Sequence, residues 1–165
     1  MTSVTFKGES VDLQGQLPEL NQPAPDFSVQ DVEGQSVSKA DFAGKTLLIS
    51  VVPDIDTSVC SIQSDKINDY AKIAAEDIAV VTISLNDNDS LKTWADEHEA
   101  VIPLYNEASK FGKDYGVYIP ELDKLARSIF VIDSQGQLAY QELVSEVTNE
   151  PDYEKAFAAV EEVKD

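Results

Sequence analysis

A chain of 165 residues, of which 42% are hydrophobic, can bury one substantial core and is too apolar to remain disordered. Its formal net charge of −19 argues against nucleic acid and anionic membranes as partners, because both bind basic surfaces. No apolar run approaches the roughly 20 residues that a membrane helix needs, and the first residues lack the apolar core of a signal peptide. We therefore expect one domain over residues 1–165, located in the cytoplasm.

The first third of the chain is predicted to form short strands that lead to one long apolar strand. Alternating apolar and polar residues on both sides of a short polar turn indicate an N-terminal β-hairpin. In chain order, the predicted elements are this hairpin over about residues 3–15, a proline-bearing connector over 17–25, strands over 26–30 and 36–38, a one-turn helix over 41–45 and a strand over 46–52.

The remainder alternates between predicted helices and strands. The near-continuous apolar run over 78–84 is typical of a parallel strand that is buried on both faces. The predicted elements are a helix from about Cys60 to 75, a strand over 78–84, a helix that begins near residues 86–90, a strand over 101–105, a helix over 108–116, a loop over 119–123, a hairpin of 128–133 with 138–144 and a helix from Pro151. This order predicts an α/β fold with a mixed sheet and helices on both faces.

The stretch that ends at Cys60 is predicted to be a strand, a turn and the start of a helix. Pro53 ends the strand because it cannot donate to a sheet ladder, and Thr57 or a neighbouring polar residue can cap the helix. The apolar residues predicted to share one face of this helix are Val59, Ile62, Ile67, Tyr70 and Ile73.

Cys60 is the only cysteine, and two interpretations of it are open. Near a helix N-terminus, the amides and the helix dipole favour the nucleophilic thiolate. Asp54 and Asp56 disfavour it through their negative charge, so a reactive Cys60 requires a basic residue from elsewhere in the fold. Alternatively, Cys60 is a buried cysteine that acts as a small hydrophobic residue.

Several separate stretches resemble one protein family. Pro53, Thr57 and Cys60 reproduce the Pro-x-x-x-Thr-x-x-Cys signature of peroxiredoxins, and residues 53–61 as a whole resemble the bacterial thiol peroxidase subfamily. Further stretches that resemble this subfamily are 5–8 with 11–13 (its N-terminal hairpin), 125–133 (the strand with its active-site arginine) and 148–154 (the start of its last helix). The resemblance implies a thioredoxin-like fold over nearly the whole chain.

The resemblance also implies roles for four residues. Cys60 would be the nucleophile that attacks a peroxide, and the hydroxyl of Thr57 would hydrogen-bond the thiolate and the peroxide oxygen. Pro53 would shield the site, and Arg127 would supply the basic partner. The alternatives are helix capping for Thr57, strand termination for Pro53 and a structural salt bridge for Arg127. No cofactor or metal is expected, since one cysteine and one histidine offer little support for a metal site.

The function implied is a thiol-dependent peroxidase that reduces hydrogen peroxide and alkyl hydroperoxides through a Cys60 sulfenic acid. The alternative is a non-enzymatic redox sensor or binding protein on the same scaffold. The subfamily usually carries a resolving cysteine on the helix after the second core strand, and that position corresponds to Ala95 here. The sulfenic acid would therefore be recycled by an external thiol such as thioredoxin, and the resemblance implies a homodimer. His98, which lies among acidic residues, is predicted to be a solvated helix residue.

Overall fold

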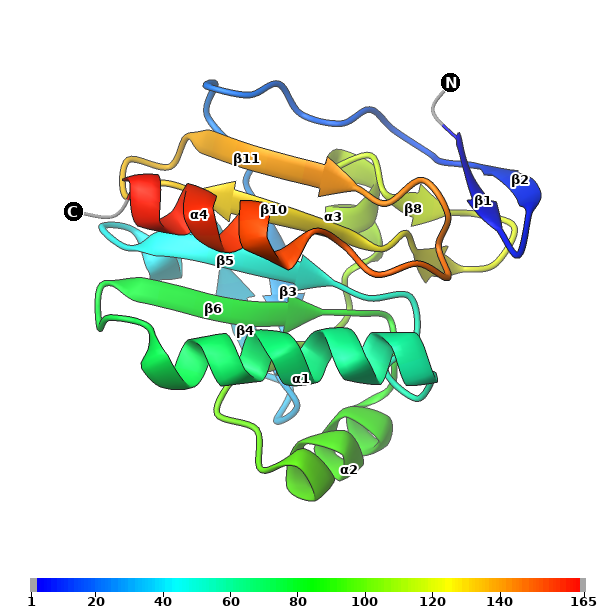
Figure 1. Ribbon diagram of the computed structural model, residues 1–165, viewed down its shortest axis with the longest axis horizontal. Helices are drawn as coiled ribbons and strands as arrows, with labels where there is room; N and C mark the ends of the chain where they lie inside the picture. Colours follow the sequence, from blue (N-terminus) through cyan, green and yellow to red (C-terminus); the bar gives the residue numbers. More distant parts are fainter. Residues whose placement is uncertain (1–2, 164–165) are drawn as a thin grey trace.

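The computed structural model describes residues 3–163, and a five-stranded mixed sheet lies at its centre (Figure 1). The strand order is β11 (Leu138–Leu143), β10 (Ser128–Ile132), β5 (Thr46–Val51), β6 (Ile78–Ile83) and β7 (Leu104–Tyr105). β5, β6 and β7 are parallel, whereas β10 is antiparallel to both β5 and β11. The predicted mixed sheet is confirmed.

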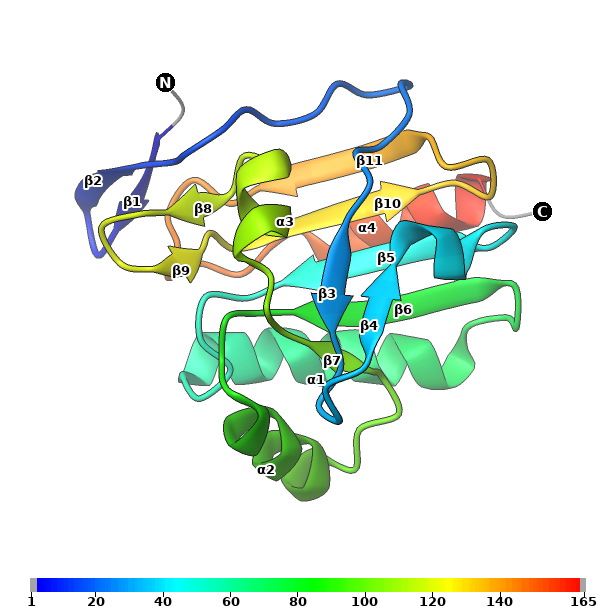
Figure 2. The same ribbon diagram turned by 180° about the vertical axis from the view of Figure 1, so that it is seen from behind.

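Helices and a small hairpin cover the two faces of this sheet. On one face, α1 (Ser58–Ile73) packs against β6, and α4 (Tyr153–Val163) packs against β10 and β11 (Figure 1). On the other face lie α3 (Ser109–Asp114) and the hairpin of β3 (Ser28–Gln30) and β4 (Ser36–Ser38), followed by the short helix η1 (Lys39–Phe42) (Figure 2). α2 (Asn88–His98) lies next to α1, beyond the sheet. None of the helices described over residues 3–163 is long and apolar enough to cross a membrane.

The core has two parts, one on each side of the sheet. Every residue of β5 is buried, because alternate side chains enter one part or the other. On the α3 side, the ring of Phe111 stacks on Tyr115 at 4.5 Å and meets Phe27 edge-to-face at 5.7 Å. On the α1 and α4 side, Ile67 is fully buried among aliphatic residues of the sheet.

An N-terminal hairpin is present as predicted, formed by β1 (Ser3–Phe6) and β2 (Glu9–Asp12). Its turn residues Lys7 and Gly8 both have positive φ, at 52° and 84°, as the tightest hairpin turns require. The carboxylate of Glu146 accepts hydrogen bonds from the backbone N–H of Lys7 at 3.2 Å and of Gly8 at 2.8 Å. These bonds tie the hairpin turn to the segment between β11 and α4.

The predicted apolar face of the Cys60 helix is correct for Ile67, which is buried, and for Tyr70, which packs against the core, but wrong for Ile62 and Ile73. Ile62 is 44% exposed and Ile73 is 81% exposed. The buried side chains of α1 are Cys60, Gln63, Ser64, Ile67 and Asn68. The two amides have partners on this buried face: the Nε2 of Gln63 donates to Ser50 Oγ at 2.8 Å, and Oδ1 of Asn68 accepts from the N–H of Val101 at 2.8 Å.

His98 is also placed differently from the prediction of a solvated residue. Its side chain is only 27% exposed, and Nδ1 lies 2.8 Å from Oδ1 of Asp65 on α1. The imidazole stacks on the ring of Trp94 at 4.3 Å. The side-by-side placement of α1 and α2 brings these groups together, and the local acidic sequence contains no sign of it.

Three further boundaries differ from the predictions. The segment predicted as a loop over 119–123 is the turn of a two-stranded hairpin, β8 (Tyr118–Ile119) and β9 (Lys124–Leu125). The predicted one-turn helix is η1, shifted towards the N-terminus, where the N–H of Ser38 donates to Asp41 Oδ2 at 2.8 Å. β7 contains only two residues of the predicted strand. Such short elements carry too few residues for a periodic pattern.

Candidate active site

The site lies at the edge of the sheet where the parallel strands β5 and β6 end. The loops that follow such strands meet, and ligands usually bind there in open α/β sheets. The N–H of Ile55, in the loop after β5, donates to Oδ1 of Asn86, in the loop after β6, at 2.8 Å. Pro53 is buried and follows the end of β5 by two residues, and α1 begins at Ser58. Cys60 therefore lies in the first turn of α1.

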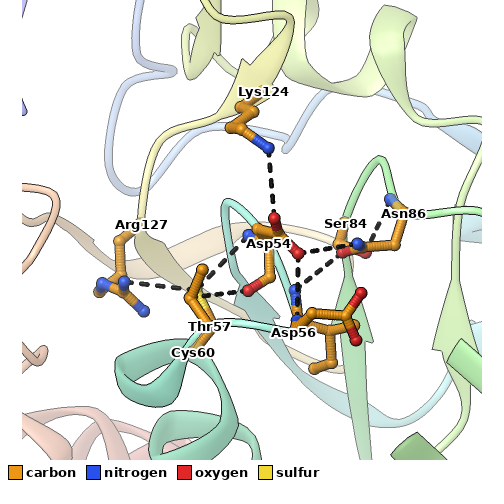
Figure 3. Close-up of polar contacts among 9 residues, drawn as sticks. Asp54, Asp56, Thr57, Cys60, Ser84, Asn86, Lys124 and Arg127 are labelled. Atoms are coloured by element: carbon orange, nitrogen blue, oxygen red, sulfur yellow. Dashed lines mark hydrogen bonds and ion pairs between the residues drawn. The ribbon is translucent and has the colours of Figure 1, made fainter. Parts of the chain in front are cut away.

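Two hydrogen-bond donors point at the sulfur of Cys60, whose residue is 1% exposed. They are the backbone N–H of Asp54 and Nη2 of Arg127, each with its nitrogen 3.4 Å from Sγ (Figure 3). The first comes from the turn just before the helix, and the second from the segment that leads into β10. Both donors stabilise negative charge on the sulfur, which is the charge that a nucleophilic thiolate carries.

Arg127 is 2% exposed, and neutral groups hold it in place. Its Nε donates to the carbonyl oxygen of Val147 at 2.8 Å, and its Nη1 donates to Oε1 of Gln63 at 2.8 Å. Within residues 3–163, no carboxylate lies at ion-pair distance from this guanidinium. A buried arginine whose charge is not neutralised by an adjacent carboxylate exerts its field on the nearby sulfur.

Gln63 is a residue of the site that the sequence analysis missed. It is fully buried and links Arg127 on one side to Ser50 of β5 on the other. A signal was present: Gln63 follows Cys60 by three residues and so shares its face of the helix. A glutamine there cannot be interpreted without knowing which distant group it meets.

Thr57 occupies the N-cap position of α1, but its side chain caps no helix amide. Its hydroxyl donates instead to the backbone carbonyl of Asp54 at 2.9 Å (Figure 3). Thr57 is exposed and lines the same cavity as Cys60. The predicted hydrogen bond from Thr57 to the sulfur is not among the contacts of this structure.

Asp54 is kept anionic beside the site. Partial burial raises the pKa of its carboxyl group, but hydrogen bonds from Asn86 and from the backbone of Asp56, together with Lys124, more than offset this and lower the pKa. Oδ1 accepts from Asn86 Nδ2 at 3.0 Å, and Oδ2 lies 3.4 Å from Nζ of Lys124 (Figure 3). The sequence analysis identified neither Asn86 nor Lys124.

A cavity of about 300 Å³ opens over Cys60. All four predicted site residues line it. The complete lining is Phe6, Lys7, Pro53, Asp54, Thr57, Ser58, Val59, Cys60, Lys124, Arg127, Val147 and Thr148. The hairpin turn at Lys7 and the segment after β11 thus form walls of the site, although both are remote from Cys60 in sequence.

Ala95 lies half-buried on α2, which is fastened to α1 by side-chain contacts. The indole Nε1 of Trp94 donates to Ser61 Oγ at 2.9 Å, and the Asp65–His98 pair lies one turn further along α1. We refer to these four residues as the α1–α2 clamp. It holds the turn that contains Cys60 against α2.

Comparisons with known proteins agree with this geometry. The profile of the Redoxin family matches residues 19–157. A protein described as thiol peroxidase from Staphylococcus aureus (strain MRSA252) is 42% identical over 166 residues, covering 99% of this chain and 100% of the relative. Another, from Bacillus subtilis (strain 168), is 42% identical over 162 residues and covers 96% of each chain.

Two solved structures have the same fold. A peroxiredoxin-like protein from Aquifex aeolicus superposes with a TM-score of 0.91 at 28% identity, covering 99% of this chain and 98% of the other. A thiol peroxidase from Chromobacterium violaceum superposes with a TM-score of 0.87 at 19% identity, covering 98% and 97%, a likeness that bears on the fold alone. The expected thioredoxin-like fold is confirmed.

Proposed function

This chain belongs to the thiol peroxidase family of peroxiredoxins and is therefore a peroxide-reducing oxidoreductase, and we propose that Cys60 carries its reaction. The thiolate of Cys60 attacks one oxygen of the hydroperoxide and the O–O bond breaks. The sulfur becomes a sulfenic acid, and the other oxygen leaves as water or an alcohol after taking up a proton. The observation that carries this proposal is the sulfur of Cys60 at a cavity, with two donors directed at it.

In this proposal, the surrounding residues stabilise the charges that change during the reaction. Arg127 and the N–H of Asp54 support the thiolate, and Arg127 meets the negative charge that develops on the leaving oxygen. The hydroxyl of Thr57 turns from the carbonyl of Asp54 towards the bound peroxide by rotation about its χ1 angle. Pro53, buried beside the cavity, limits the access of water.

The recycling step needs a second thiol, because the chain contains no other cysteine. We propose that an external thiol, such as that of thioredoxin, condenses with the sulfenic acid, and that a further thiol releases Cys60 from the mixed disulfide. Hydrogen peroxide and alkyl hydroperoxides are the proposed substrates. A cytoplasmic homodimer is the proposed working form, which sedimentation and cell fractionation would test.

The decisive experiment is peroxide consumption by Cys60→Ser with dithiothreitol as reductant. We expect the rate to fall at least roughly a thousandfold, because an unactivated hydroxyl is a far weaker nucleophile than a thiolate. Circular dichroism should show an unchanged fold, since serine is nearly isosteric with cysteine. Full activity in this variant would refute the assignment. A redox sensor would differ from the wild-type enzyme by being oxidised once without consuming many equivalents of peroxide.

A further inference from the structure

Arg127 is the only arginine of the chain, and each of its three nitrogens has a partner of its own. Nη2 faces the sulfur of Cys60, and Nη1 donates to Gln63 (Figure 3). Nε donates to the backbone carbonyl of Val147 at 2.8 Å, in a turn between β11 and α4. Because the guanidinium is planar and rigid, the place of this carbonyl helps to set the direction of Nη2.

The backbone of Val147 is held by β1 of the N-terminal hairpin. The N–H of Thr5 donates to the carbonyl of Ser145 at 2.7 Å, and the N–H of Val147 donates to the carbonyl of Thr5 at 2.8 Å. These two bonds form a short parallel bridge between the hairpin and the segment after β11. A continuous path of hydrogen bonds therefore runs from the hairpin through Val147 to Arg127 and on to the sulfur.

The carboxylate of Glu146 closes this junction, because both of its oxygens accept hydrogen bonds. The donors are the hydroxyl of Thr5 (3.0 Å) and the N–H of Gly8 (2.8 Å) to Oε1, and the N–H of Lys7 (3.2 Å) with the N–H and the hydroxyl of Thr148 (2.9 Å each) to Oε2. Each oxygen thus accepts from the hairpin, and Oε2 also accepts from the residue that follows Val147. A carboxylate suits this place, since both of its oxygens only accept.

We propose that Glu146 is a positioning residue for the peroxidase reaction, because it fixes the carbonyl of Val147 that holds Arg127. The inference rests on the proposed function of Cys60. Glu146 is not among the residues that line the cavity, so its effect on the sulfur passes through Arg127. The N-terminal hairpin, which is remote from Cys60 in sequence, thereby helps to align the cation that supports the thiolate.

Glu146→Gln is the first variant, since it keeps the size of the side chain. Both carboxylate oxygens accept from backbone N–H groups, so either orientation of the new amide places its NH₂ group against a donor. One side of the junction then opens. We expect the reaction with hydrogen peroxide, and the alkylation of Cys60 by iodoacetamide at neutral pH, each to slow roughly fivefold as Arg127 loses its alignment. Circular dichroism checks that the fold is retained.

The direction of the change separates positioning from charge. Removal of a negative charge would by itself favour the thiolate and speed alkylation, whereas loss of alignment slows it. Glu142→Gln is the matched control, because this carboxylate also accepts from a backbone N–H, that of Asp152, at 2.9 Å. Its hydrogen bonds lead to Asp152 and Tyr140 and not to Val147. Both rates in this control should stay within about twofold of wild type, since an exposed charge is screened.

The guanidinium of Arg127 can also be observed directly. As the only arginine, it gives a single Nε–H signal in NMR spectra, which needs no assignment. This buried, hydrogen-bonded proton should exchange slowly in the wild type and in Glu142→Gln, and faster in Glu146→Gln. Thr5→Val removes one donor to Glu146 while keeping the shape of the side chain, and should produce the same changes at smaller size.

A double-mutant cycle tests whether Glu146 acts through Arg127. In an Arg127→Met background, Glu146→Gln should have no further effect on alkylation, because the two residues act as one unit. An equal slowing with and without Arg127 would overturn the inference, as would an unchanged or faster alkylation in Glu146→Gln. If Cys60→Ser still consumes peroxide at the full rate, the proposed function of Cys60 fails instead. The two failures are distinguishable, since alkylation and proton exchange are measured without peroxide.

Discussion

At the scale of single residues, the position of Arg127 depends on Gln63. The amide of Gln63 satisfies Nη1 of Arg127 and the hydroxyl of Ser50 at the same time, in a fully buried place. The donor that faces the sulfur, Nη2, belongs to the same rigid guanidinium. An error of about 1 Å in such a group can cost a large factor in rate. Gln63 is thus a positioning residue that acts on Cys60 through Arg127.

Replacement of Gln63 by leucine should therefore slow the reaction with peroxide roughly tenfold, compared with roughly a hundredfold for Arg127→Met. Gln63→Leu should also destabilise the fold by about 1.5–3 kcal/mol, because a hydrogen bond to a charged group is lost. The measurements are the second-order rate with hydrogen peroxide and the rate of Cys60 alkylation by iodoacetamide at neutral pH.

Gln141→Leu is the control for loss of stability alone, since the Nε2 of Gln141 donates to the carbonyl of Pro18, away from the cavity. This control should leave both rates unchanged. Equal alkylation rates in wild type and Gln63→Leu would mean that Arg127 keeps its position without the glutamine.

Only part of this residue-scale picture was predictable from sequence. Pro53, Thr57 and Cys60 lie within one turn and helix start, so their proximity follows from the strand, turn and helix pattern. Arg127 is 67 positions from Cys60, and only a resemblance pointed to it. Gln63, Asn86 and Lys124 act through contacts that exist only once the sheet has aligned distant loops, and no local pattern contains them.

At the scale of elements, Glu146 joins the N-terminal hairpin to the active-site wall. Hydrogen bonds from the backbone of Thr148 and Gly8, with smaller contributions from the hydroxyls of Thr148 and Thr5, lower the pKa of this carboxyl group from 4.5 to about 2. A group whose pKa is lower in the folded state stabilises the fold above its unfolded pKa. That contribution is lost as the pH falls from about 4.5 towards 2.

Acidification over this range should therefore release the hairpin from the cavity wall. We expect the protection of the amides in β1 and β2, measured against the intrinsic exchange rate at each pH, to fall as the pH falls from about 4.5 towards 2, with the core strand β5 less affected. In Glu146→Gln, the hairpin amides should already be weakly protected at neutral pH, and their protection should change less as the pH falls. Exposed Glu121 provides the control variant, Glu121→Gln, which should behave as wild type. Hairpin protection that stays constant across this range would contradict the role given to Glu146.

The elements were predicted most reliably where a long run of apolar residues is buried on both faces. β5 and β6 are mostly apolar because both faces of the sheet are covered. α1 failed as a pattern because its buried face contains Gln63, Ser64 and Asn68, while Ile62 and Ile73 point outward. A prediction from hydrophobic periodicity assumes that buried residues are apolar. This helix instead buries the amides of Gln63 and Asn68, which are hydrogen-bonded to other parts of the fold.

At the scale of the whole molecule, the presence of one cysteine would make the proposed redox cycle intermolecular. If Cys60 forms a sulfenic acid as proposed, its own chain offers no second cysteine to reduce it, and without an added thiol it is open to further oxidation to the sulfinic form. We expect peroxide alone to add first one oxygen and then two to the mass of the chain. A small thiol supplied in excess should replace these products by a mixed disulfide that turns over.

Ala95→Cys should convert this cycle into an internal one. Ala95 lies on α2, which the clamp holds beside the Cys60 turn, so the new thiol is close in the fold but separated by packed helices. The two sulfurs can bond only if one helix end unwinds, because disulfide geometry tolerates little separation. Weakening the clamp in the same protein, with Trp94→Phe to remove the indole donor, should therefore speed formation of the disulfide. The readouts are a mass loss of two hydrogens under mild peroxide and protection of Cys60 from the sulfinic form.

Ala100→Cys, at the half-buried position just beyond α2, is the control for an added thiol elsewhere. If Ala95→Cys yields no internal disulfide with or without the clamp, position 95 does not correspond to the resolving position.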